Sequence, residues 1–175
     1  MMRTIKASTA NYGEWRAHST VRYIVIHYTK GNKDTAENEG IYFSRPHSPK
    51  SSAHFFIGRD GDIVKSVGLD HVAYSVGGKK YSDCAKTGGG RYYRKCMNSN
   101  SVSIELCDNL KRDPSPEQIE AVKKTIAYIQ KYCKNAKTII RHFDVNGKHC
   151  PERMMDNKKW EDFCEKLAGV GVRKG

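Results

Sequence analysis

Residues 22–29 read RYIVIHYT, a run of β-branched and aromatic side chains that contains one histidine near its end. Such a run is typical of a central β-strand, and the polar stretch KGNKD at 30–34 marks the point where the strand ends. His27 is therefore predicted at a strand end, where its side chain can face a surface lined by loops. The rest of the fold is built outward from this strand.

The segments that follow alternate between helix, hairpin and loop signals. Residues 35–43 read as a short helix, which the Arg45-Pro46 pair ends. Two short apolar runs, 54–58 and 62–67, flank a turn at 59–61 and predict a β-hairpin. Residues 77–100 are rich in Gly, Lys, Tyr and Ser without periodicity. A loop of this length in a compact domain is usually functional or mobile, so we expect it to border a substrate groove.

The second half of the chain supplies further strands and helices. Residues 101–107, SVSIELC, alternate as a strand and place Ser103 and Glu105 on one face, which we interpret as the polar or site face. Ser115, Pro116 and Gln118 form the start of a helix that continues to about residue 133. A short strand at 138–141 and an amphipathic helix at 158–167 complete the pattern. Together these elements predict a single α/β domain with a central mixed β-sheet flanked by helices.

Length and composition define the class of molecule. The chain has 175 residues, enough for one domain with a substantial core, and 29% of them are charged. No apolar run approaches the roughly 20 residues that cross a bilayer, so no stable membrane insertion is predicted. The first residues, MMRTIKASTANYGEW, lack the apolar stretch of a signal peptide, which predicts synthesis in the cytoplasm. We expect a catalytic domain at 1–168 and a linker-like tail, GVGVRKG, at 169–175.

The net charge bears on the possible partners, and the spacing of the cysteines bears on their redox state. Lys and Arg outnumber Asp and Glu by 31 to 19, a formal net charge of +12, which favours binding to polyanions such as nucleic acid, anionic membrane or acidic cell-wall polymer. The cations are scattered and no nucleic-acid-binding motif accompanies them, so we expect a solvated basic surface and no nucleic-acid partner. The cysteines are spaced irregularly and are expected to be reduced thiols; they lie at 84, 96, 107, 133, 150 and 164.

The segment 141–152, RHFDVNGKHCPE, contains the strongest chemical signal. His142 and Cys150 lie eight residues apart directly after a predicted strand, and Asn146-Gly147 supplies a turn that can bring them together. Imidazole nitrogen and thiolate are ligands that zinc prefers, and a catalytic zinc usually has three protein ligands. His27 is the natural third candidate, although a strand-end histidine taken alone is more often structural.

Four stretches together resemble a known family. YIVIHYT, SSAHFFIGRDGDIVKSV, NSVSIELCD and RHFDVNGKHCP occur in this order between residues 23 and 151. They resemble the zinc-dependent N-acetylmuramoyl-L-alanine amidases, which include phage endolysins, bacterial autolysins and peptidoglycan-recognition proteins. The resemblance implies a surface groove with one Zn²⁺ held by His27, His142 and Cys150. It also implies that Lys148 points at the substrate carbonyl and that Glu105 handles the attacking water.

The same resemblance implies an activity and leaves one alternative. It predicts hydrolysis of the amide between N-acetylmuramic acid and L-alanine in bacterial peptidoglycan, by a phage or prophage endolysin that reaches the cell wall after release. A non-catalytic peptidoglycan-binding module of the same fold is the alternative, but such relatives typically lose the metal cysteine, which is present here as Cys150. A non-catalytic interpretation stays open for both residues: Lys148 is then an ordinary surface lysine, and Glu105 is a carboxylate that pairs with a nearby cation.

Several positions depart from the family pattern or receive a structural interpretation. Ala53 stands where some branches carry a tyrosine beside the zinc. We therefore expect no tyrosine-assisted mechanism here and assign the catalytic role to Glu105. Ser75 and Val76 replace residues that contact substrate in many relatives. Three further histidines are interpreted as structural or locally hydrogen-bonded side chains: His54, His71 and His149.

Overall fold

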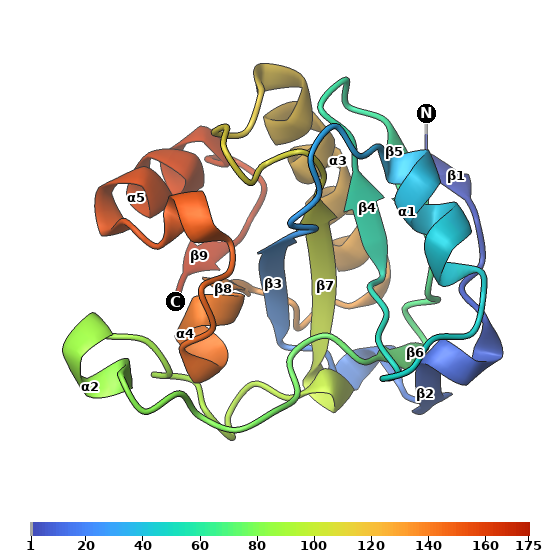
Figure 1. The fold of residues 1–175 in the computed structure, drawn as a ribbon, viewed down its shortest axis with the longest axis horizontal. Helices are drawn as coiled ribbons and strands as arrows, with labels where there is room; N and C mark the ends of the chain where they lie inside the picture. Colours follow the sequence, from blue (N-terminus) through green and yellow to red (C-terminus); the bar gives the residue numbers. More distant parts are fainter. Residues whose placement is uncertain (1) are drawn as a thin grey trace.

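A seven-stranded mixed sheet forms the centre of the molecule in a computed structural model that describes residues 2–175 (Figure 1). The strand order is β1-β5-β4-β7-β3-β8-β9, and neighbouring strands are parallel except β4 and β5. The strands are β1 (Met2–Thr4), β3 (Tyr23–Tyr28), β4 (Phe55–Ile57), β5 (Ile63–Lys65), β7 (Ser101–Leu106), β8 (Thr138–Arg141) and β9 (Arg173–Lys174). A separate antiparallel pair joins β2 (Tyr12–Trp15) to β6 (His71–Ala73). The predicted fold class is confirmed.

Helices lie on both faces of this sheet (Figure 1). The α-helices are α1 (Ala36–Phe43), α2 (Cys84–Thr87), α3 (Pro116–Tyr132), α4 (His142–Asn146) and α5 (Asn157–Lys166). Single 3₁₀ turns occur at η1 (Thr9–Asn11), η2 (His18–Thr20), η3 (Asn98–Asn100) and η4 (Glu152–Met154). Within residues 2–175, none of the helices has the length and apolar character that spanning a bilayer requires.

Side-chain alternation along β3 assigns the two faces of the sheet. Ile24 and Ile26 are fully buried in the main core, together with apolar residues of α3 and α5. Val25 points the other way and packs with Val145 of α4. Because side chains alternate along a strand, His27 lies on the same face as Val25. That face is covered by α4 on one side and by α1 on the other, and the candidate site lies between them (Figure 1).

The longest helix, α3, starts where the sequence predicts. The Ser115 hydroxyl accepts a hydrogen bond from the Gln118 backbone N–H at 3.1 Å, and the Gln118 side chain accepts one from the Ser115 N–H at 3.2 Å. This reciprocal pair satisfies two amides at the helix start. The Gln118 amide also donates to the backbone oxygens of Ile57 and Cys107, so the cap ties α3 to β4 and to the end of β7. The predicted hairpin is confirmed as the antiparallel β4–β5 pair.

Other elements lack a sequence signal that would predict them. The segment 77–100 contains α2 and η3 and is packed against α4 rather than free. The predicted linker-like tail contains β9, which pairs in parallel with β8, so residues 173–174 belong to the sheet. The domain boundary at residue 168 stays a prediction.

All six cysteines are free thiols, as expected.

Candidate metal centre and groove

The carboxyl ends of three neighbouring parallel strands assemble the site. In the β3–β7 ladder His27 is the register partner of Glu105, so the two side chains lie side by side on one face. In the β3–β8 ladder Ile26 is the partner of Arg141, which places His142, the next residue, close to His27. Parallel pairing therefore brings together residues that are 37 to 115 positions apart in the chain.

Three donor side chains converge at this point. The Nδ1 atoms of His27 and His142 are 3.1 Å apart, and the Cys150 Sγ lies 3.7 Å from His27 Nδ1. All three side chains are buried, and their donor atoms lie within 4.8 Å of one another. A tetrahedral zinc bound at its usual bond lengths separates two nitrogens by about 3.3 Å and a nitrogen and a sulfur by about 3.6 Å. The three donors are thus already at the spacing of ligands that share one ion.

The protonation states also suit a metal. Burial, and then the neighbouring His142 ring, hold the pKa of His27 well below its ordinary value. Burial, with the Lys148 ammonium nearby, lowers the pKa of His142 to about 3. Both imidazoles are therefore neutral near pH 7 and keep a lone pair for an ion. Burial raises the pKa of the Cys150 thiol, and a bound cation would favour its thiolate. The residues present therefore fit Zn²⁺.

The segment that carries two of these donors is held by a buried ion pair. The Arg141 guanidinium donates to the Asp144 carboxylate at 2.9 and 2.7 Å, and both side chains are almost completely buried. The same guanidinium donates to the backbone oxygen of Met154 at 2.8 Å. Further along, the Phe143 N–H donates to the Cys150 carbonyl at 2.8 Å. These contacts fix the chain on both sides of the His142 to Cys150 segment.

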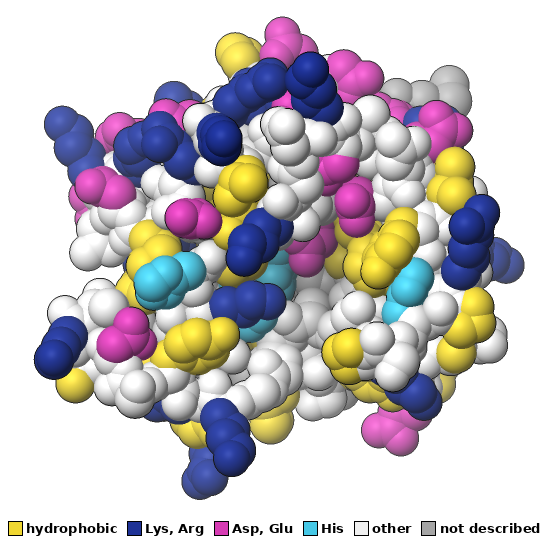
Figure 2. All heavy atoms as spheres, viewed as in Figure 1, with side chains coloured by type: hydrophobic (Ala, Val, Ile, Leu, Met, Phe, Trp, Pro, Cys, Tyr) yellow, Lys and Arg dark blue, Asp and Glu magenta, His cyan; other side chains and the backbone are white. Residues whose placement is uncertain are grey.

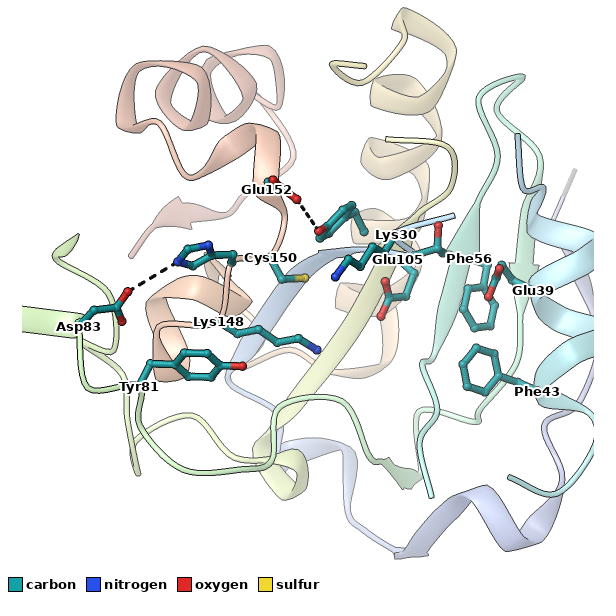
Figure 3. A pocket seen from close by; sticks show the side chains of 13 residues that line it. Lys30, Glu39, Phe43, Phe56, Tyr81, Asp83, Glu105, Lys148, Cys150 and Glu152 are labelled. Atoms are coloured by element: carbon teal, nitrogen blue, oxygen red, sulfur yellow. Dashed lines mark hydrogen bonds and ion pairs between the residues drawn. The ribbon is translucent and has the colours of Figure 1, made fainter. Parts of the chain in front are cut away.

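The donor cluster adjoins a groove of about 750 Å³ between α1 and the loop that follows α4, and Cys150 is the donor that lines it. In the space-filling view, cationic, acidic and histidine side chains meet around a hollow near the centre of this face (Figure 2). Cys150, Glu105 and Lys148 line the groove, and Lys148 points into it from the side of α4 (Figure 3). The α1 side is lined by Phe43, Phe56 and Glu39. The structure thus brings all five predicted site residues to one place.

Glu105 lies at the floor of this groove. Its Oε1 is 3.8 Å from His27 Nδ1, and its Oε2 is buried without a hydrogen-bond partner within residues 2–175. Burial raises the pKa of Glu105 to about 8, an effect that the Lys148 ammonium opposes. With this pKa the carboxyl group is mostly protonated near pH 7, and a cation bound beside His27 would favour the carboxylate that can accept a proton.

The three histidines that were given a structural interpretation lie outside the donor cluster. His54 is fully buried and hydrogen-bonded to Ser103 and Arg16, so it forms part of the core. His71 pairs with Asp70, and the exposed His149 lies 3.7 Å from a carboxylate oxygen of Asp83.

Three groove residues have no signal in the sequence that singles them out. Tyr81 belongs to the loop 77–100, which the sequence predicts to border a groove and which does so, but nothing in the loop marks Tyr81 itself. Glu39 and Phe43 come from a short helix whose polar and apolar positions look ordinary. Only the folded position of α1 and of the loop shows that they line the groove. Ala53 is buried and does not line the groove. The position where some branches of the family carry a tyrosine beside the zinc therefore contributes no side chain to the groove.

A buried three-donor cluster that opens onto a groove beside a carboxylate and an ammonium is characteristic of catalytic rather than structural metal sites. Residues 17–153, well over half of the chain, match the family model described as N-acetylmuramoyl-L-alanine amidase. The chain belongs to this family.

Curated relatives agree with this assignment. The chain is 28% identical over 136 residues to the N-acetylmuramoyl-L-alanine amidase CwlL of Bacillus licheniformis, an alignment that covers 75% of this chain and 36% of CwlL. It is 25% identical over 146 residues to the amidase XlyB of Bacillus subtilis, covering 81% of this chain and 40% of XlyB. The chain therefore spans about two fifths of the length of these relatives.

Solved structures share the fold. PlyL superposes with a TM-score of 0.69 at 21% identity, covering 98% of this chain and 99% of PlyL. The catalytic domain of XlyA superposes with a TM-score of 0.68 at 20% identity, covering 96% of this chain and 99% of that domain. At this level of identity, the likeness establishes the common α/β architecture.

Proposed function

We propose that this chain is a zinc-dependent amidase that hydrolyses the bond between N-acetylmuramic acid and L-alanine in bacterial peptidoglycan. The observation that carries the proposal is the convergence of His27, His142 and Cys150 at ligand spacing, beside a groove that Cys150, Glu105 and Lys148 line. Membership of the amidase family and the named activities of CwlL and XlyB support the choice of bond.

The proposed roles follow from what amide hydrolysis requires. His27, His142 and Cys150 would hold the ion, which when bound supplies Lewis acidity and lowers the pKa of water. Glu105 accepts a proton from the attacking water and passes it to the leaving nitrogen as the carbon–nitrogen bond breaks. The Lys148 ammonium stabilises the negative charge that develops on the carbonyl oxygen. The products are the carboxylic acid on the sugar side and the free amine of L-alanine.

The biological setting is part of the proposal. Relatives more than twice as long as this chain indicate that it corresponds to the catalytic part of an endolysin or autolysin, for which we propose residues 1–168 as the domain. The net charge of +12 suits an anionic cell wall. A phage or prophage enzyme that acts on the wall after release fits these features.

The bond that is cut tests the proposal directly. Zinc-loaded protein incubated with purified peptidoglycan should release new alanine amino termini and no new reducing sugar ends. Reducing ends as the main product would indicate a glycosidase, which needs two carboxylates about 5 to 10 Å apart, and would refute the amidase. Tight sedimentation with peptidoglycan and no new ends of either kind would instead identify a binding module.

A further inference from the structure

The segment 77–92 is held firmly against α4, although it contains little regular structure. Three of its backbone amides donate to carbonyl oxygens of α4: Tyr81 to Asn146 at 2.8 Å, Gly90 to Phe143 at 3.0 Å and Tyr92 to Asp144 at 2.8 Å. The Cys84 thiol also donates to the Asn146 carbonyl at 3.4 Å. These bonds hold residues 77–92 against α4, and we call this segment the wall of the groove.

The buried side chain of Asn146 connects this wall to the residues of the site. The Asn146 amide nitrogen donates to the Gly77 carbonyl at 3.2 Å, at the beginning of the segment. Its amide oxygen accepts from the Lys148 backbone N–H at 3.0 Å. Asn146 thus sets the distance between the wall and the loop that carries Lys148 and Cys150.

Close packing at Gly147 further restricts the position of the segment 77–92 relative to the loop that carries Lys148. A Cβ atom at this position would lie 2.3 Å from the Cys84 Sγ and 3.1 Å from the Tyr81 Cβ, and its φ of +91° is in the region that favours glycine. Only a glycine allows the wall to approach the loop this closely. The base of the Tyr81 side chain is therefore fixed relative to Lys148.

Tyr81 is the aromatic side chain that this wall presents to the groove. Its ring is 47% exposed, and its hydroxyl points into the groove in the same direction as the Lys148 ammonium (Figure 3). A tyrosine loses little conformational entropy on binding because it has only two side-chain torsions, and it offers both an apolar ring and a polar hydroxyl. On a wall held in this way, such a side chain is preorganised for contact with a ligand.

We propose that Tyr81 is a substrate-contacting residue, which binds the part of the muropeptide that lies beside Lys148 and helps to place the scissile amide. The identity of this ligand, an amino sugar joined through a lactyl amide to a short peptide, rests on the proposed function. The contact itself follows from the wall, the exposed ring and its direction.

The test measures binding separately from turnover. In a Glu105→Gln background, which blocks hydrolysis, calorimetric titration with a soluble muropeptide gives Kd with and without Tyr81→Ala. The matched control is Tyr132→Ala, because Tyr132 is 42% exposed but lies on α3, away from the groove. We expect Tyr81→Ala to weaken binding about 5- to 30-fold, the usual result of truncating an important contact. Tyr132→Ala should change Kd less than twofold, and both variants should keep the parent Tm.

The possible outcomes separate this inference from the proposed function. Equal Kd values for the Tyr81→Ala and Tyr132→Ala proteins would show that Tyr81 does not contact the muropeptide, even if the parent enzyme cleaves peptidoglycan. A fall in Tm of the Tyr81→Ala protein matched by the loss in binding would assign Tyr81 a structural role and would also overturn the inference. No binding by the Glu105→Gln protein itself would contradict the proposed substrate, and with it the ligand assigned to Tyr81.

Discussion

Replacing Glu105 with glutamine separates a catalytic from a structural role at the floor of the groove. The glutamine has nearly the same shape, so the packing against His27 and β4 is retained. The parent carboxylate makes few structural interactions that the substitution could remove. One oxygen is 3.8 Å from His27 Nδ1, and the other is buried without a hydrogen-bond partner within residues 2–175. Because burial raises the pKa of Glu105 from 4.5 to about 8, the parent loses stability as pH rises through this range, and the neutral glutamine does not. We therefore expect the Glu105→Gln protein to be at least as stable as the parent at pH 7.

The effect on turnover should be much larger. An amide cannot accept the proton of the attacking water, and losing a general base typically lowers the rate by about 10² to 10⁴. Ala53 supplies no hydroxyl at the corresponding position, and among the carboxylates that line the groove Glu105 lies beside His27. The decrease should appear in kcat, because Glu105 acts on the water rather than on the bound glycan or peptide.

The assay combines turbidity loss of purified cell walls with metal analysis and thermal unfolding of the same samples. Glu120→Gln is the matched control, because Glu120 lies exposed on α3 and pairs with the neighbouring Lys123 on the same helix. The Glu105→Gln protein should keep its metal and have a Tm no lower than that of the parent while losing activity, and the control should behave as the parent. Wall clearance by Glu105→Gln at near the parent rate would mean that the base has been assigned to the wrong residue.

Three further changes test other parts of the site. Lys148→Ala should keep metal and Tm but lower kcat about 10²- to 10³-fold, measured as alanine amino termini released, because one oxyanion stabiliser is removed; an unchanged kcat would make Lys148 an ordinary surface cation. Cys150→Ser should lose zinc in elemental analysis, since a hydroxyl is a poor substitute for thiolate, and full zinc occupancy would remove Cys150 from the ligand set. Burial, with Asp34 nearby, raises the pKa of Glu39 from 4.5 to about 7, so the parent loses stability as pH rises through this range. Glu39→Gln should therefore raise Tm relative to the parent at pH 8 more than at pH 5, and an equal difference at both pH values would contradict the shift.

Much of the fold can be predicted because its signals are local. The strand at β3 is a continuous apolar run, and α3 starts with a serine, a proline and a glutamine at the required spacing. The hairpin is marked by its Asp-Gly turn. By contrast, β9 has two residues and β2 has four, and short edge strands depend on partners far away in the chain rather than on their own pattern. The position of such strands is settled only when the sheet forms.

The site divides in the same way. His27, His142 and Cys150 have a recognisable chemistry and lie at strand ends or turns, so residue type and spacing indicate them. Tyr81 lies in an aperiodic loop, and its position in the groove depends on Asn146 and Gly147, more than 60 residues later in the chain. Contacts of this kind have no local signature. Residues that shape the groove are therefore harder to predict than residues that perform its chemistry.

The buried Arg141–Asp144 pair shows how the fold supports that chemistry. A buried ion pair contributes little net stability, because the cost of desolvating both charges offsets their attraction. Its value here is geometric. The guanidinium is held by Asp144, stacks over the Phe143 and Trp160 rings and donates to the Met154 carbonyl beyond Cys150. A hydrophobic side chain could fill the same volume, but it could not hold the chain at both ends of the His142 to Cys150 segment. Since metal affinity depends on donors that are already at ligand spacing, this pair stabilises the arrangement that the ion requires.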